Sequence, residues 1–219
     1  MARYHIPARF RSGFNSLIEL DNASLELLTN RLSNFPIGGG HYSLVDFLHD
    51  LPIANIDEIA STIYSFGNIL IDRSKNIEDI ANGLVKSYLA DEDNNANPDK
   101  ENHYITILVS IFISAVNVKI SYKAMTLATD VPNIFRESNI ICDIRMVFAD
   151  DISDARRNAI ISQQIKLVYS ENGEEKVLYV NADRQDLESL RDQIDRAISK
   201  EKILKNDYSE VFNIIEIGD

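Results

Sequence analysis

The stretches ICDIRMVF at 141–148 and IISQQIKLVYSENGEEKVLYVNADRQDLESLRDQIDRAISKEKIL at 160–204 decide the fold. Apolar residues alternate with others in both stretches, which is the two-residue period of a β-strand with one buried face. We therefore predict two strands. On the first, one face carries Ile140, Cys142, Ile144, Met146 and Phe148, and on the second it carries Ile161, Ile165, Leu167 and Tyr169.

A tight turn and a long helix complete this C-terminal module. Asn172-Gly173 is typical of a hairpin turn because both residues accept a positive φ, so a third strand over 176–180 should pair with the second. Asp183 is placed to cap a helix, with Asp186 three residues later. The helix should lie across the apolar face of the sheet through one stripe, made of Leu187, Leu190, Ile194, Ala197 and Leu204.

Helical spacing of apolar residues dominates the chain before this module. Pro7 and Gly13 suggest an extended arm over residues 1–20. Polar breaks then separate several helices, with Asp21 or Asn22, Asn55 and Asn76 as the expected caps. Asn55 should begin a helix from Ile56 to about Leu70, and the longest helix is expected from Tyr104 to Ala128. The predicted fold class is α+β, an all-helical N-terminal domain followed by a three-stranded antiparallel meander and a long C-terminal amphipathic helix. The predicted divisions are the arm 1–20, the helical domain 21–130, the β-β-β-α module 139–205 and a C-terminal tail 206–219.

Composition excludes several classes of protein. The 219 residues carry a formal net charge of −12, which disfavours binding to the phosphates of nucleic acid. One cysteine, Cys142, allows no internal disulfide and fits a reducing compartment. The most apolar run, Tyr104 to Val118, has the length of a buried helix, so we expect no membrane span. The opening MARYHIPARF lacks a continuous apolar run, so we expect no secretion signal and a cytoplasmic location.

Three motifs imitate catalytic or ligand sites. His49-Asp50, with His41 eight residues earlier, lacks the second pair that a metal phosphohydrolase would need. The glycines at 38–40 lack the Lys-Ser/Thr of a phosphate-binding loop and are better read as a helix stop. The loop 91–102 has acidic and amide residues at alternate positions, but it lacks the glycine and the final glutamate of a calcium loop. We therefore expect no enzyme activity, no cofactor and no metal.

The order of strand, long loop, strand, tight turn, strand and helix resembles the COMM domain, the C-terminal module of a family of trafficking and scaffold proteins. The likeness covers roughly 140–205, and the helical part resembles the N-terminal domain of the same proteins. The stretches IPARFRSGFNSL and NIICDIRMVF are also similar to bacterial proteins of this plan, so we expect a bacterial relative. The family's usual strand tryptophan is replaced by Ile144, and Ile160-Ile161 stands where a proline is common.

The resemblance implies a dimer in which the helix and sheet of each module complete the core of the other, and it implies no catalytic residues. A three-stranded sheet with one helix also buries little by itself, which independently favours a partner. The expected partner is a second copy of the chain, with other proteins as further candidates. The residues expected to form core and interface are Ile144, Ile161, Ile165, Leu167, Tyr169, Leu178, Val180, Leu187, Leu190 and Ile194.

The first functional hypothesis is thus a non-enzymatic scaffold protein that oligomerises through its C-terminal module. Two alternatives remain open. The chain could be a regulatory subunit of a multi-protein complex, such as a defence or toxin-control system. It could instead be a small ligand-binding protein or enzyme with a pocket between its two halves, near His41, His49 and Asp50.

Overall fold

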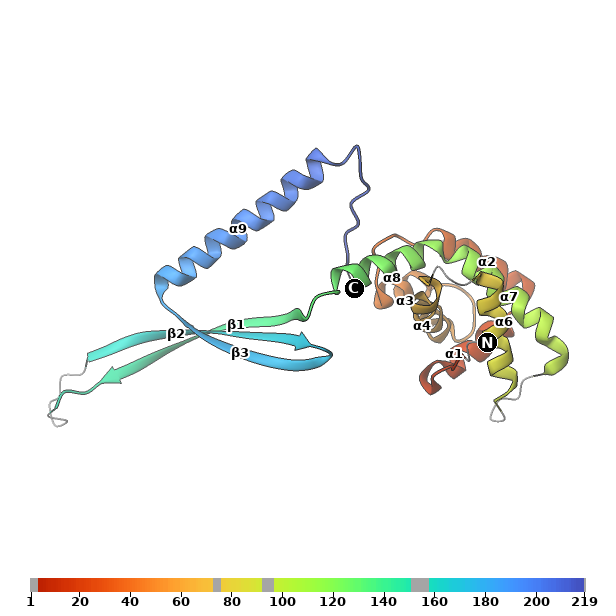
Figure 1. The fold of residues 1–219 in the computed structure, drawn as a ribbon, viewed down its shortest axis with the longest axis horizontal. Helices are drawn as coiled ribbons and strands as arrows, with labels where there is room; N and C mark the ends of the chain where they lie inside the picture. Colours follow the sequence, from red (N-terminus) through yellow and green to blue (C-terminus); the bar gives the residue numbers. More distant parts are fainter. Residues whose placement is uncertain (1–3, 73–75, 92–96, 151–157, 219) are drawn as a thin grey trace. The chain divides into compact units, whose positions relative to one another are not determined.

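A computed structural model describes residues 4–72, 76–91, 97–150 and 158–218. The chain forms two compact units, each described by itself below. The first contains residues 1–128 and 215–219, and the second contains residues 129–214. Figure 1 labels their elements. The mixture of helices with one antiparallel sheet and a long C-terminal helix confirms the predicted α+β class.

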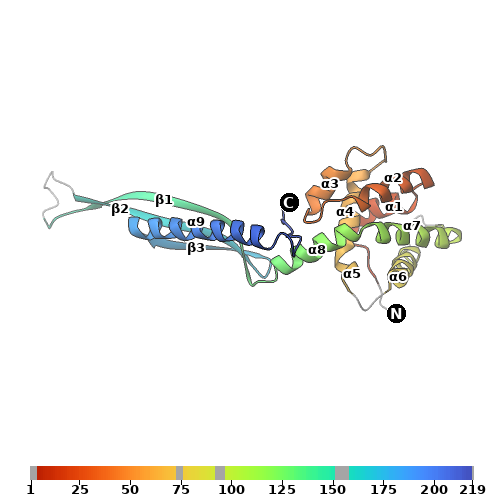
Figure 2. The same cartoon turned by 90° about the horizontal axis from the view of Figure 1, so that it is seen from above.

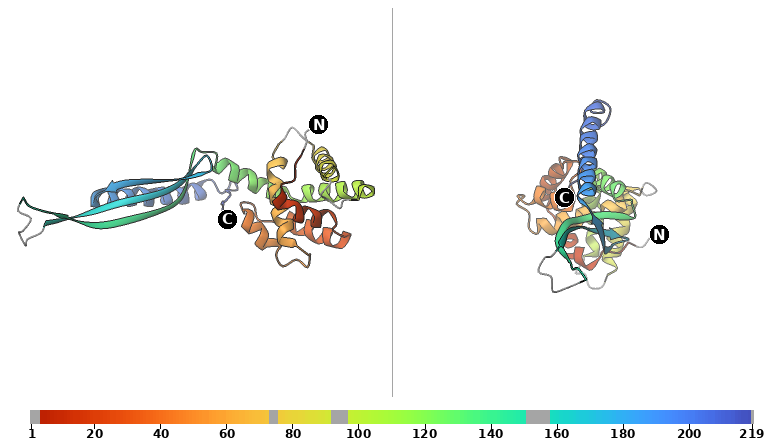
Figure 3. Two further views of the ribbon diagram at one scale, coloured as in Figure 1. Left: turned by 90° about the horizontal axis from the view of Figure 1, so that it is seen from below. Right: turned by 90° about the vertical axis from the view of Figure 1, so that its left-hand side faces the viewer.

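The first unit is helical and holds nearly all of the buried apolar side chains. Asp21 caps its second helix by accepting a hydrogen bond from Ser24 N at 2.7 Å, and Asn76 caps another by accepting from Glu78 N, both as the sequence predicts. The helices surround a common core (Figure 3). They are η1 (Ala8–Phe10), α1 (Arg11–Ile18), α2 (Asn22–Ser33), α3 (His41–Leu48), α4 (Ile56–Ser65), α5 (Gly67–Leu70), α6 (Ile77–Leu89), η2 (Pro98–Lys100), α7 (Glu101–Ser114) and α8 (Val116–Ala128).

The predicted extended arm at 1–20 is wrong. Residues Ala8–Phe10 and Arg11–Ile18 are helical, and Phe14, Leu17 and Ile18 are fully buried. Gly13, which suggested irregular backbone, instead permits a close approach to α4: a Cβ there would lie 2.2 Å from the backbone oxygen of Glu58. The glycine therefore marks helix packing rather than a turn.

Two helices expected to be continuous are broken. The one predicted over 56–70 stops at Ser65, and Gly67 begins α5 beside Tyr122, whose Cγ would lie 2.4 Å from an added Cβ. Asn55, expected to cap α4, has a φ of 57° and makes no capping hydrogen bond. The long helix predicted from Tyr104 to Ala128 is likewise divided at Ala115, with a bend of 63° between its parts.

The last residues of the chain pair with the glycine loop of the first unit. Gly40 N donates to Gly218 O at 2.9 Å, and Gly218 N donates to Gly38 O at 3.3 Å. Gly38 has a φ of 104°, and a Cβ there would meet Glu216 O at 2.0 Å. The glycine loop thus ends α2, as predicted, and also forms an isolated parallel bridge with Gly218 near the C-terminus. The predicted tail 206–219 is therefore partly structured.

The second unit contains a three-stranded antiparallel sheet in the order β1-β2-β3. Its strands are β1 (Asn133–Val147), β2 (Asn158–Glu171) and β3 (Glu174–Ala182), and Figure 2 shows them as one long ribbon. β1 begins six residues before the predicted boundary at 139, with a bulge between Phe135 and Glu137. Asn172 and Gly173 form the predicted turn with φ values of 52° and 88°.

The final helix, α9 (Arg184–Asp207), begins with a capping box in which Asp183 and Asp186 satisfy each other's backbone N–H groups. This start was predicted, but the packing of the helix was not. No residue of α9 is buried, and Figure 1 shows the helix diverging from the sheet after β3. The expectation that α9 covers the sheet of its own chain is therefore wrong.

Candidate interaction surface

The strand register collects apolar side chains on one face of the sheet. Residues directly opposite each other in antiparallel strands share a face. The register pairs Ile144 with Ile161, Ile140 with Ile165, and both Ser138 and Leu178 with Leu167. We call this surface the apolar sheet face. Its members are Asn133, Phe135, Ser138, Ile140, Cys142, Ile144, Met146, Ala159, Ile161, Gln163, Ile165, Leu167, Tyr169, Glu171, Glu174, Lys176, Leu178, Val180 and Ala182.

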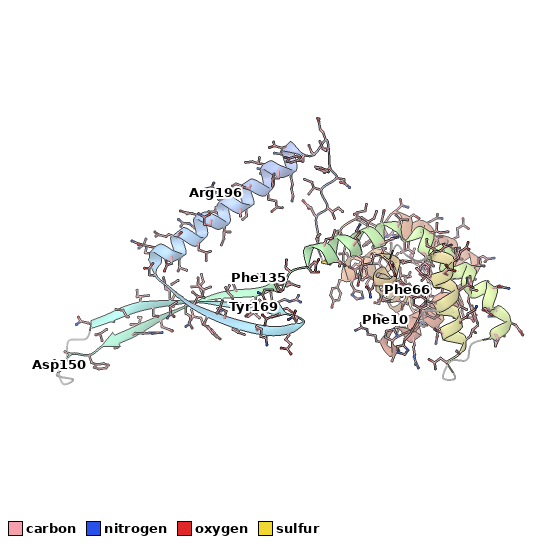
Figure 4. The ribbon with its side chains drawn as sticks, viewed as in Figure 1. Phe10, Phe66, Phe135, Asp150, Tyr169 and Arg196 are labelled. Atoms are coloured by element: carbon pink, nitrogen blue, oxygen red, sulfur yellow. The ribbon has the colours of Figure 1, made fainter. Side chains whose placement is uncertain are left out.

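This face is open to solvent, and its charged side chains lie at the hairpin end of the sheet, where they are Glu171, Glu174 and Lys176. Ile144 is 72% exposed and Ile161 is 74% exposed, while Ile165, Leu167 and Tyr169 are half-buried. Figure 4 labels Phe135 and Tyr169, which the register places opposite each other on β1 and β2. Contiguous apolar surfaces of this kind mark sites of protein interaction. No other element of the described second unit buries this face, as one would in an ordinary domain core.

The opposite face of the sheet has a different composition. It mixes apolar side chains with Asp143, Arg145 and Lys166. Val168 and Ser170, also on this face, are the buried side chains of the described second unit. Charged side chains therefore lie along the middle of this face but only at the hairpin end of the apolar sheet face, and this difference allows a matched pair of substitutions.

Helix α9 carries a second uncovered apolar surface. Leu190 and Ile194 are 43% and 50% exposed, and Leu187 is half-buried. We call Leu187, Leu190, Ile194, Ala197 and Leu204 the helix stripe, since they recur at spacings of three and four residues. Glu201 interrupts the stripe and pairs with Lys205 at 2.8 Å. Side chains of α9, including Arg196, project into open space (Figure 4).

Helix α9 is somewhat shorter than the strand that it would cover. The 14 residues of β2 extend about 46 Å at 3.3 Å per residue. The 24 residues of α9 extend about 36 Å at 1.5 Å per residue. One helix can therefore cover most of one sheet. Every residue predicted to form core and interface lies on one of these two surfaces, and its role in association stays a prediction.

The other sequence motifs do not converge on a common site. His41 Nε2 is 3.0 Å from Ser61 Oγ, whereas Arg31 donates to both carboxylate oxygens of Asp50. His49 Nδ1 is 3.0 Å from Asp57 Oδ1, and this hydrogen bond raises the pKa of His49 above its ordinary value. Across the described residues, no three His, Cys, Asp or Glu side chains are arranged to hold a metal ion.

Parts of two predicted loops lie outside the described residues. They are residues 92–96 of the loop at 91–102 and residues 151–157 of the loop at 149–158. Where it is described, the first loop is partly helical, because Asn97 caps η2 and α7 begins at Glu101. Cys142 is exposed on the apolar sheet face, so the expectation that it is buried within its own chain is wrong.

No protein-family model matches the chain, and no curated protein matches it. Among the described helices, none is by itself long and apolar enough to cross a membrane. The residues from Pro98 to Ser114 and α8 meet that test only when taken together, across their 63° bend.

Proposed function

We propose that this protein is a non-enzymatic scaffold that assembles with a second copy of itself through the C-terminal module. The observation that carries the proposal is that the apolar sheet face and the helix stripe are both uncovered within one chain. Both surfaces are largely apolar, and the helix extends about 36 Å against about 46 Å for β2, so it can cover most of the length of the sheet. Burial of apolar surface is the main favourable term in association, so a partner that covers both surfaces is strongly favoured.

A second copy supplies that partner most simply. In a two-fold dimer the α9 helix of each protomer lies on the apolar sheet face of the other, so that one symmetric contact covers four surfaces. The COMM-like order of elements supports the same arrangement, because modules of that family interlock in this way. β1 and β3 are the two edges of the sheet and offer further backbone hydrogen bonds to a partner.

The mass of the purified protein tests this proposal. Light scattering during size-exclusion chromatography at micromolar concentration should give at least twice the chain mass of 24.8 kDa. A second run after further dilution should show the same mass if the interface resembles an obligate dimer. A single species of 24.8 kDa throughout this range would contradict the proposal.

Absence of a catalytic role and a cytoplasmic location belong to the same proposal. The single exposed cysteine is compatible with a reducing compartment. Assembly through the C-terminal module leaves the helical unit free to contact other proteins or small molecules. In this proposal the second unit forms the oligomer, and the first unit provides the binding surface for other proteins or small molecules.

A further inference from the structure

The first unit contains a polar and aromatic cavity of about 490 Å³. It lies entirely within that unit, between the N-terminal segment and helices α3, α4, α5, α6 and α8. Its volume falls within the range of small-molecule sites. This cavity differs from the pocket between the two halves of the chain that the sequence suggested, because residues of one unit alone line it.

Three aromatic rings form one wall of the cavity. His41, at the start of α3, packs edge-on against Tyr64 of α4 with centroids 5.8 Å apart. Tyr64 in turn packs against Tyr122 of α8 at 5.6 Å. Ser61, one turn before Tyr64, holds the His41 ring through the 3.0 Å contact between Nε2 and Oγ. This wall offers flat apolar surface with fixed polar groups at its edge.

The side chains that line the cavity differ from the acidic composition of the chain. The protein has 34 acidic residues against 22 lysines and arginines, yet none of the described residues that line this cavity is acidic. The lining includes Arg9, His5 and His41. Arg9 lies over the Phe10 ring at 4.7 Å, and within the described residues no carboxylate forms an ion pair with it. A guanidinium in this setting is well suited to bind a carboxylate or phosphate.

We propose that this cavity binds a small organic anion, a flat ring that bears one carboxylate or phosphate group. The ring packs against the wall formed by His41, Tyr64 and Tyr122, and the anionic group lies toward Arg9. Apolar contact supplies most of the affinity, while the charged group fixes the orientation. This site is independent of the apolar sheet face and would be present in a monomer as well as in a dimer.

Isothermal titration calorimetry on the full chain tests the proposal with two pairs of probes. One pair is indole-3-carboxylate and indole-3-carboxamide, and the other is adenosine monophosphate and adenosine. The anion of at least one pair should bind at least about tenfold more tightly than its neutral counterpart, which corresponds to about 1.4 kcal/mol. The pair that shows the difference identifies carboxylate or phosphate as the preferred group. Equal affinity within both pairs, or no binding of either anion, would overturn the proposal.

Substitutions then locate the binding site. Arg9→Glu should weaken binding of the preferred anion at least about tenfold. The matched control is Lys123→Glu, which makes the same charge change at an exposed α8 position beside Tyr122 but outside the cavity. That variant should bind within about twofold of the unchanged protein. An equal loss of affinity in both variants would show that net charge alone governs binding, and it would overturn the proposed site.

Discussion

Ile161→Asp should convert the assembled protein into protomers. Ile161 is 74% exposed in a single chain and pairs across the strands with Ile144, so the substitution removes little packing within one protomer. In a dimer covered by α9, the same change places a carboxylate in an apolar interface. Burial of an unpaired charge costs several kcal/mol, so the dissociation constant should rise at least about a hundredfold. Light scattering at micromolar concentration should then report 24.8 kDa.

Ile160→Asp is the matched control for this variant. Ile160 is the preceding residue of β2, is 56% exposed, and pairs with Arg145 on the opposite face of the sheet. The two variants change the same residue type, the same net charge and nearly the same strand position. Ile160→Asp should therefore keep the mass of the unchanged protein. Equal behaviour of the two variants, whether both associate or both dissociate, would count against the apolar sheet face as the interface.

Leu17→Ala should strongly destabilise the helical unit. Leu17 is fully buried in α1, beside Phe14 and Ile18 in the same core. Removal of a buried leucine side chain and the cavity that remains typically cost about 2–5 kcal/mol. Urea unfolding followed by circular dichroism at 222 nm should show this loss in the free energy of unfolding, measured at one protein concentration so that association contributes equally.

Leu27→Ala makes the same chemical change on a solvent-exposed face of α2. Leu27 is 46% exposed, so the expected loss is within about 0.5 kcal/mol. The comparison separates burial from helix propensity, since both residues lie in helices. If α1 were the loose arm that Pro7 and Gly13 first suggested, the two variants would be equally stable.

The C-terminal elements could be predicted because local signals encode them. Two-residue alternation defines the strands, positive φ at Asn172 and Gly173 defines the turn, and Asp183 with Asp186 defines the start of α9. None of these signals depends on distant parts of the chain. The same alternation places the predicted interface residues of β1, β2 and β3 on one face, as the register confirms.

The wrong predictions of secondary structure in the helical unit share a physical cause, which is contact between elements distant in the sequence. Gly13 suggested an irregular arm, but it allows α4 to approach α1 closely, whereas Gly67, inside the helix predicted over 56–70, begins α5 beside Tyr122. The apolar residues Phe14, Leu17 and Ile18 have the three- and four-residue spacing of a helix, and this signal could have revealed α1. The cavity in the helical unit could not be foreseen, because its lining comes from elements as distant as His5 and Tyr122.

Cys142 gives the most direct test of the central claim, that a second copy covers the apolar sheet face. It is the single cysteine of the chain, lies on that face and is exposed in one protomer. The reaction of its thiol with Ellman's reagent therefore reports whether the face is covered. At micromolar concentration the native protein should react at least about tenfold more slowly than the Ile161→Asp variant, because a covered thiol reacts only when the interface opens. Equal, rapid reaction of the native protein and the variant would contradict the account.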